Sequence, residues 1–243
     1  MNVKRILIAV VVIVILYAII RAIFSPDPHT NIAPAKEAQT VSASDLQSGD
    51  TSTSNFTYSI WFYVDDWNYK YGEPKIILGR MSAESATTPQ FGLVLGAMKN
   101  DLNITVDTYP GEGSDTTPTD SSAPSSTHTC NVQNVPLQKW VHCLVSLYGK
   151  SLDVYLDGKL VRTCVLDGVA KVDSTTDVSV TPMGGFSGFT SYFQYWAAAT
   201  NPQEAYNIYK KGYGGSALGN LFNKYRVRFS FLVDNKEQGS FEI

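Results

Sequence analysis

Hydrophobic and polar residues alternate along much of the chain, and this alternation predicts a protein built mainly of short β-strands. The clearest case is the segment 56–65 (FTYSIWFYVD), in which every second side chain is apolar. A period of two gives a strand with one apolar face and one mixed face. Further strands are predicted at 75–80, 91–98, 102–109 and 189–196, each bounded by turn-forming residues.

The segment 140–166 contains the most definite supersecondary structure. Three runs, at 140–148, 151–156 and 159–166, are separated by Gly149-Lys150 and Asp157-Gly158. Both connectors suit two-residue hairpin turns, whose positive φ angles favour Gly and Asp. The three strands should therefore form an antiparallel meander. Its predicted register pairs Leu156 with Lys159, Val154 with Val161, Val145 with Val154, and Leu147 with Leu152.

This register assigns each side chain of the meander to one of two faces. Asp153 lies opposite Arg162, so we expect a cross-strand ion pair worth roughly a few tenths of a kcal/mol. The core face carries Val141, Cys143, Val145, Leu147, Leu152, Val154, Leu156 and Val161. The other face carries His142, Leu144, Ser146, Asp153, Tyr155, Arg162 and Cys164.

The chain has three cysteines, Cys130, Cys143 and Cys164. Their spacing matches no zinc-binding pattern. Two states remain open: one disulfide with one free thiol, if the domain faces an oxidising space, or three free thiols. Cys143 and Cys164 lie on opposite faces of the predicted meander, which prevents a bond between them. If a disulfide forms, the register favours Cys130 with Cys164.

An apolar run occupies residues 6–24, with Arg21 near its end. At about 1.5 Å per residue in a helix, it nearly crosses a hydrocarbon core of about 30 Å. Lys4 and Arg5 precede it, so the positive-inside rule predicts a cytosolic N-terminus. A cleaved signal peptide is the alternative, but no small-residue cleavage site closely follows the run. We therefore predict a transmembrane anchor at 1–24 of a single-pass membrane protein.

The anchor is followed by a segment, 25–54, that is rich in Ser, Thr and Pro and has no apolar period. It is interpreted as a flexible stalk. The segment 110–128 is equally polar and is predicted to be a long exposed loop. The last part of the chain, 216–243, alternates again and is predicted to form a C-terminal β-hairpin extension.

One short helix is predicted after the last aromatic strand. Asn201 is a suitable N-cap, Pro202 suits the first helical position, and Gly212 suits the stop. Glu204 falls near the third helical position. The buried side should carry Ala205, Ile208 and Tyr209.

Composition narrows the class of protein. The 243 residues are 44% hydrophobic, 12% aromatic and 17% charged, which is typical of a β-rich globular domain. The net charge of −3 argues against a nucleic-acid partner, because such proteins present a basic face. Many short strands without alternating helices predict an all-β fold, an antiparallel jelly-roll β-sandwich. The chain is too long for an immunoglobulin domain of about 100 residues.

Three stretches carry a resemblance to a known family. They are NFTYSIWFYVDDW, VPLQKWVHCLVSLYGKSLDVYLDGKLVRTCVL and GGFSGFTSYFQYWAAATNPQEAYNIYKKG. Their order, a Trp-led strand, a YLDGKL hairpin and a closing helix, resembles the laminin-G-like, concanavalin-A-like jelly-roll superfamily over residues 55–215. The set, with the apolar N-terminus, also resembles membrane-anchored virion proteins of large DNA viruses. The resemblance implies a binding or structural module, with relatives that bind glycans, bind proteins or hydrolyse glycans.

The residue pattern argues against catalysis. Hydrolases of this superfamily carry an E-x-D-x-x-E strand, and the chain has none. His142 and Cys143 are neighbours on a strand, so they point to opposite faces and form no dyad. We therefore expect no enzymatic activity and no catalytic residue. A calcium site at the sandwich rim is known among the relatives, and Asp101, Asp107, Asp115 and Asp120 are candidates, but they define no ligand set and we expect no metal or other cofactor.

The mixed face of the meander is the candidate ligand surface. Tyr155, Arg162 and Asp153, with nearby aromatic residues such as Trp61 or Tyr63, offer a surface on which a sugar ring could stack. The alternative, which we favour, is that another strand or the helix covers this face.

Two functions from different classes follow. The first is a non-enzymatic, membrane-anchored structural or adhesion protein, a minor capsid component of a virion that links a membrane to the capsid shell through protein contacts. The second is a glycan-binding lectin on a virion or cell surface. A glycoside hydrolase is a third, remote reading. A soluble lectin activity would separate the first two, since a structural tether binds no glycan.

Overall fold

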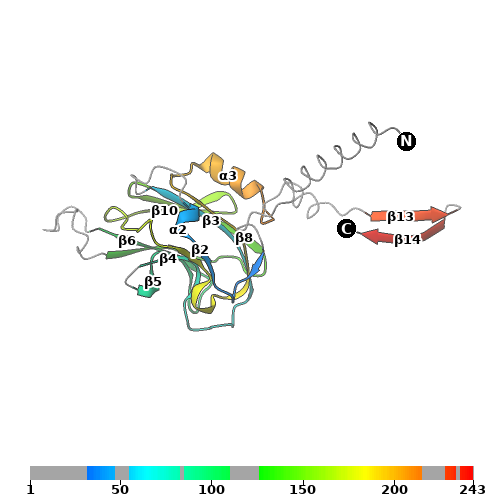
Figure 1. Ribbon diagram of the computed structural model, residues 1–243, viewed down its shortest axis with the longest axis horizontal. Helices are drawn as coiled ribbons and strands as arrows, with labels where there is room; N and C mark the ends of the chain where they lie inside the picture. Colours follow the sequence, from blue (N-terminus) through cyan, green and yellow to red (C-terminus); the bar gives the residue numbers. More distant parts are fainter. Residues whose placement is uncertain are drawn as a thin grey trace, which may run out of the picture.

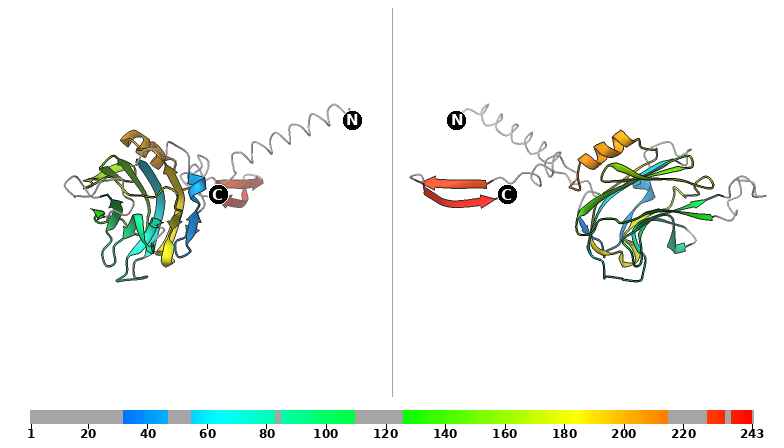
Figure 2. Two further views of the ribbon diagram at one scale, coloured as in Figure 1. Left: turned by 60° about the vertical axis from the view of Figure 1, so that its left-hand side comes forward. Right: turned by 180° about the vertical axis from the view of Figure 1, so that it is seen from behind.

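A computed structural model describes residues 32–46, 55–82, 85–109, 126–214, 228–233 and 236–242. Two six-stranded antiparallel sheets pack face to face around one core, with a short helix, α3 (Pro202–Lys210), on the outer side of one sheet (Figures 1 and 2). The antiparallel sandwich predicted from the alternation is confirmed, and its two layers fit a jelly roll.

Sheet A has the strand order β1-β12-β3-β8-β9-β10, and sheet B has the order β2-β11-β4-β5-β6-β7. The strands of sheet A are β1 (Ala33–Pro34), β3 (Phe56–Asp66), β8 (Trp140–Tyr148), β9 (Ser151–Leu156), β10 (Lys159–Val165) and β12 (Ser187–Trp196). Those of sheet B are β2 (Gln39–Val41), β4 (Lys75–Ser82), β5 (Ser85–Leu95), β6 (Leu102–Thr108), β7 (Ser126–Val132) and β11 (Val178–Val180).

The core lies between the sheets and is filled by the inward side chains of both. Tyr58 of β3 stacks on Phe91 of β5, with ring centroids 4.3 Å apart, so an aromatic contact joins the two layers. Phe56 meets both rings edge-on. Burial of such rings supplies a large share of the hydrophobic stabilisation of a sandwich of this size.

The stalk prediction is wrong for part of its range, because residues 33–46 belong to the sandwich. β1 pairs with β12, β2 pairs with β11, and a short helix, α2 (Ala43–Leu46), follows. Ala35, Val41 and Leu46 are buried in the common core. Strands of two and three residues show no period in the sequence, so their tertiary pairing could not be read from it.

The meander forms as predicted up to a bulge in β10. Leu156 lies opposite Lys159, and Val145 opposite Val154, as expected. Between Leu160 and Arg162 the register shifts, so Val154 lies opposite Arg162 instead of Val161. One extra residue in a bulge moves every later side chain to the other face. Val161 is consequently exposed, although the pattern assigned it to the core.

The bulge also changes the partner of Asp153. Its carboxylate lies opposite Thr163 and accepts a hydrogen bond of 2.6 Å from the Thr163 hydroxyl. The ion pair predicted between Asp153 and Arg162 is therefore wrong.

The same shift turns Cys164 toward the core side, where it forms a disulfide with Cys130 of β7. This is the pairing that the sequence favoured, although the predicted face of Cys164 was wrong. The bond joins an edge strand of sheet A to an edge strand of sheet B. Cys143 is a buried free thiol.

Helix α3 begins and ends close to the predicted positions. The Asn201 side chain accepts from the Glu204 amide, and the Glu204 carboxylate accepts from the Asn201 amide, which completes a capping box. Ala205 and Ile208 are buried beneath the helix, as predicted, and Tyr209 is half-buried.

A separate two-stranded sheet consists of β13 (Arg228–Val233) and β14 (Lys236–Glu242), which is the predicted C-terminal hairpin. The loop expected at 110–128 begins outside the described residues, and its last three residues belong to β7. The anchor predicted at 1–24 also lies outside the described residues. Among the helices that the structure describes, none has the length and apolar character needed to span a membrane.

Candidate functional site: an aromatic row on sheet A

The ligand face predicted from the sequence is largely covered by α3. Tyr155 is 1% exposed and Trp61 is 5% exposed. Tyr155 packs with Leu144, Ala205 and Ile208 in a small apolar cluster under the helix. The alternative reading, in which the helix covers this face, is therefore the correct one. Neither Tyr155 nor Trp61 is available to a ligand.

The other two predicted ligand residues lie at the open edge of the sheet. Arg162 is exposed on β10, and the Asp153 carboxylate is held by Thr163. The four residues thus do not form one surface.

A different set of aromatic residues does come together on the outer face of sheet A. Phe189, Tyr63 and Trp140 are direct cross-strand neighbours on β12, β3 and β8. The ring centroids lie 6.4 Å apart for Phe189 and Tyr63, and 5.8 Å for Tyr63 and Trp140. Adjacent strands therefore present three rings side by side, as cross-strand pairing requires.

A fourth ring extends this set beyond the sheet. Tyr213, three residues past α3, stacks on Trp140 with centroids 4.6 Å apart and planes 6° apart. The Ser191 hydroxyl donates a hydrogen bond of 2.6 Å to the Tyr213 carbonyl, which fixes the backbone there. We call Phe189, Tyr63, Trp140 and Tyr213 the aromatic row.

The aromatic row is accessible, in contrast to the predicted face. Phe189 is 42% exposed, and the other three residues are half-buried. The buried ring of Trp61 supports the row from beneath α3, since it meets Tyr213 edge-on and stacks on Tyr209. The rings are thus held in place on one side and open to solvent on the other.

One carboxylate near the row, that of Asp157, is already paired. Asp157, in the turn between β9 and β10, accepts from the Lys139 ammonium at 3.1 Å and from the His142 amide at 2.9 Å. These bonds explain why an Asp occupies the turn at a φ of 49°. The carboxylate is therefore a structural group of the turn.

His142 and Cys143 lie on opposite faces of β8, which agrees with the expected absence of a dyad. The His142 ring is bonded to the Ser59 hydroxyl at 2.9 Å, and burial lowers its pKa to about 4. Burial raises the pKa of the Cys143 thiol to about 12. At neutral pH both groups are uncharged.

The calcium candidates are dispersed. The Asp107 carboxylate accepts from the Thr127 hydroxyl, and the Asp101 carboxylate accepts from the Asn134 amide. Asp115 and Asp120 lie outside the described residues. In the part of the chain that the structure describes, no three acidic, His or Cys side chains cluster closely enough to hold a metal ion.

A pocket of about 440 Å³ lies between the end of β12 and α3. Trp196, Thr200, Asn207 and Lys211 are among its lining residues. Glu204, another lining residue, is engaged in the capping box, and Asn207 accepts from Gln203. Its polar groups are thus largely satisfied within the chain, so the aromatic row is the better candidate.

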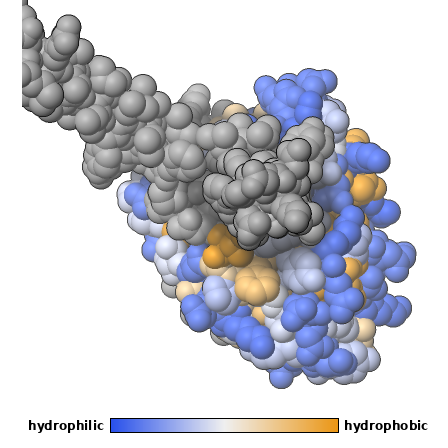
Figure 3. All heavy atoms as spheres, turned by 90° about the vertical axis from the view of Figure 1, so that its right-hand side faces the viewer, coloured by the Kyte–Doolittle hydropathy of each residue, from blue (hydrophilic) through white to orange (hydrophobic). Residues whose placement is uncertain are grey.

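Figure 3 shows one face of the molecule, on which apolar side chains gather in small patches between hydrophilic ones.

The sandwich and its outer helix together define a jelly-roll domain of the laminin G type. The chain belongs to the concanavalin A-like lectin/glucanases superfamily, whose laminin G model matches residues 36–205. The match begins within the segment that the sequence assigned to a stalk, in agreement with its place in the sandwich.

Solved structures similar to this chain include receptor-binding domains of botulinum neurotoxins. The domain of the C/D mosaic serotype is 10% identical, with a TM-score of 0.47, and the match covers 67% of this chain and 39% of that one. The type G domain is 13% identical, with a TM-score of 0.45, and the match covers 74% and 46%. This chain therefore spans less than half the length of these structures. No curated protein sequence matches it.

Sequence reasoning named Tyr63 as a neighbour of the candidate face but missed Phe189, Trp140 and Tyr213 as its companions. β3 and β8 are separated by some 80 residues in the chain, so their register could not be read from the sequence. The only signal in the sequence was the alternation of side chains along each strand. It places Tyr63, Trp140 and Phe189 on the outer faces of their strands.

Proposed function

We propose that this protein is a non-enzymatic carbohydrate-binding module, carried on a chain that its apolar N-terminal run attaches to a membrane. The observation that carries the proposal is the aromatic row, a set of supported and accessible rings on the outer face of sheet A. The family to which the chain belongs, described as lectins and glucanases, supports the same class of ligand.

The chemistry of the row suits a sugar chain. A pyranose ring has an apolar C–H face that stacks on an aromatic ring, while its hydroxyls reach polar groups at the margin. Phe189, Tyr63 and Trp140 cross three neighbouring strands, so a linear glycan of a few units would follow them. The hydroxyls of Tyr63 and Tyr213 are of a type that can donate hydrogen bonds to sugar hydroxyls and accept hydrogen bonds from them.

The surroundings of the row favour binding over hydrolysis. A glycosidase needs two carboxylates about 5–10 Å apart across a cleft. Asp157, a carboxylate close to the strand that carries Trp140, is held by Lys139 and by the His142 amide.

The location of the protein follows from the sequence prediction. An anchor at 1–24 would place the sandwich outside the cytosol, where the disulfide between Cys130 and Cys164 would persist. The tether between a viral membrane and a capsid shell stays a prediction.

A glycan array tests the proposal with the full chain in mild detergent. We expect a small set of related glycans to bind, and Trp140→Ala to reduce that binding at least about tenfold. Tyr148→Ala is the matched control, because Tyr148 is 71% exposed and lies away from the row, so its loss should leave binding unchanged.

Trp140→Phe separates stacking from folding. It keeps a ring at this position, so it should retain most of the binding, whereas a general loss of fold would abolish binding in every variant. Absence of any glycan signal for the unmodified chain would refute the proposal.

A further inference from the structure

The four edges of the two sheets differ in how well they are protected. β1 has two residues, one of them Pro34, and β2 has three. β7 has seven residues, but its exposed side chains are polar. Short strands, proline and polar side chains are the usual means by which proteins prevent an edge from pairing with another chain.

β10, the outer strand of sheet A, is longer than β1 and β2 and, unlike β7, exposes aliphatic side chains. It has seven residues, and all but Cys164 are exposed. Among them Leu160 is 49% exposed, Val161 45% and Val165 69%. Three exposed aliphatic side chains on a free edge resemble a strand that lacks its neighbour.

The charges on β10 have one sign. Lys159 and Arg162 are exposed, and neither forms an ion pair among the described residues. The nearest acid on the adjoining strand, Asp153, is occupied by the Thr163 hydroxyl. An incoming strand with carboxylates would therefore find two unpaired cations.

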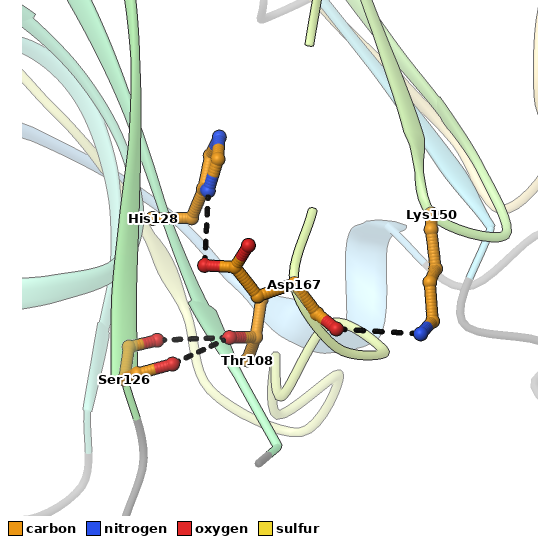
Figure 4. A network of polar contacts seen from close by, with 5 residues as sticks. All are labelled: Thr108, Ser126, His128, Lys150 and Asp167. Atoms are coloured by element: carbon orange, nitrogen blue, oxygen red, sulfur yellow. Dashed lines mark hydrogen bonds and ion pairs between the residues drawn. The ribbon is translucent and has the colours of Figure 1, made fainter. Parts of the chain in front are cut away.

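The edge is also held rigid, which lowers the entropic cost of adding a strand. The disulfide fixes Cys164 to β7. Figure 4 shows the next anchor, Asp167, just past the end of β10. Its carboxylate lies 3.7 Å from His128 of β7, and its carbonyl accepts from Lys150 in the turn between β8 and β9.

We propose that β10 is a docking edge for an extended acidic segment of a partner protein, which adds to sheet A as a seventh strand. Backbone hydrogen bonds to the free edge would provide the pairing, and carboxylates would meet Lys159 and Arg162. Apolar side chains of the segment would cover Leu160 and Val165. This surface is distinct from the aromatic row and does not depend on glycan binding.

The bulge and the two cations also have a protective reading, in which they keep two copies of the chain apart. That reading explains Lys159 and Arg162, but it leaves Leu160, Val161 and Val165 unexplained, since an edge protected from pairing would expose polar groups. A partner with acidic side chains accounts for both sets.

Synthetic peptides test the proposal against the full chain in mild detergent. One capped octapeptide alternates Val and Glu, a second alternates Val and Lys, and a third has the Val-Glu pattern with two prolines. We expect the Val-Glu peptide alone to bind by fluorescence anisotropy and to slow amide hydrogen exchange over 159–165. Proline removes a donor from the added strand, and lysine repels the edge.

The variant K159E/R162E should weaken binding of the Val-Glu peptide at least about tenfold and should improve binding of the Val-Lys peptide. Lys99→Glu is the charge-matched control, because Lys99 is exposed in the β5–β6 connection, away from β10. Both variants should unfold at the temperature of the unmodified chain.

Three outcomes would overturn the proposal. The peptides could bind equally, which would indicate unspecific apolar adsorption. The Val-Glu peptide could bind without protecting 159–165, which would place its site elsewhere. The unmodified chain could form a dimer in which 159–165 is protected, which would assign the edge to a second copy.

Discussion

Trp140 of β8 and Tyr213 stack face to face, with ring centroids 4.6 Å apart, and this contact ties the segment after α3 to sheet A. Because the stack lies in the aromatic row, it contributes both to the placement of α3 and to the proposed binding surface. The two contributions can be measured separately.

A double-mutant cycle on this pair measures its stability contribution. We expect Tyr213→Ala to lower the free energy of unfolding by about 1–2 kcal/mol, with a coupling to Trp140→Ala of about 0.5–1.5 kcal/mol. Urea unfolding of the two single variants and the double variant gives the coupling. Tyr148→Ala, at an exposed site with no ring partner among the described residues, should change stability little. Additive losses at Trp140 and Tyr213 would contradict the stacking contribution.

Loss of the disulfide should cost stability. Cys130 and Cys164 close a loop with a sequence separation of 34, for which chain entropy predicts about 3–4 kcal/mol. We expect Cys164→Ser, or reduction with dithiothreitol, to lower the free energy of unfolding by about this amount. Cys143→Ala is the control, because it removes the free thiol and should leave the response to dithiothreitol intact. An unfolding transition indifferent to reductant would show that the bond does not form.

The buried His142 should make the domain less stable in mild acid. Burial holds its pKa at about 4, below the ordinary value of 6.5, so the unfolded chain takes up a proton more readily than the folded one. Its stability contribution is complete above pH 6.5 and is lost as the pH falls toward 4, by about 3 kcal/mol at pH 4. Comparison with His142→Gln isolates this loss from carboxylate titration. His128→Gln should keep the full acid sensitivity; a parallel pH dependence in His142→Gln would refute the assignment.

Lys75 carries a buried amine that forms no hydrogen bond or ion pair among the described residues. Its side chain is 1% exposed, its ammonium lies 4.5 Å from the ring centroid of Trp67, and burial lowers its pKa below the ordinary 10.5. Lys75→Met should therefore raise the free energy of unfolding at pH 7 by about 1–2 kcal/mol. The Lys75 amine binds its proton more tightly in the unfolded chain than in the folded one. The destabilisation caused by Lys75 therefore decreases as the pH rises to 10.5. The gain in the free energy of unfolding from Lys75→Met should decrease over the same range. Lys99→Met, at an exposed site, should show neither effect.

The meander shows which features of the fold could be predicted from the sequence and which could not. Turn chemistry at Asp157-Gly158 and the alternation of β8 and β9 predicted the pairing of Leu156 with Lys159 correctly. The bulge after Leu160 was not predictable, because it depends on how β10 fits against β9 and against Cys130 across the sandwich. This single shift overturned the Asp153–Arg162 ion pair and the burial of Val161.

The candidate site depended still more on tertiary contacts. Tyr155 and Trp61 are residue types that often occur in binding surfaces. They are buried here because α3 lies over them. Phe189, Tyr63 and Trp140 are far apart in the chain and meet only through the pairing of β12, β3 and β8.

The features that depend on neighbouring residues could be predicted from the amino-acid sequence alone. These are the alternation of the strands, the two-residue turns and the capping box of α3, because each rests on interactions within a few positions. Tertiary structure decided which strands are neighbours, which face α3 covers and which edge stays open. Those choices depend on contacts between distant segments, whose register no local pattern encodes.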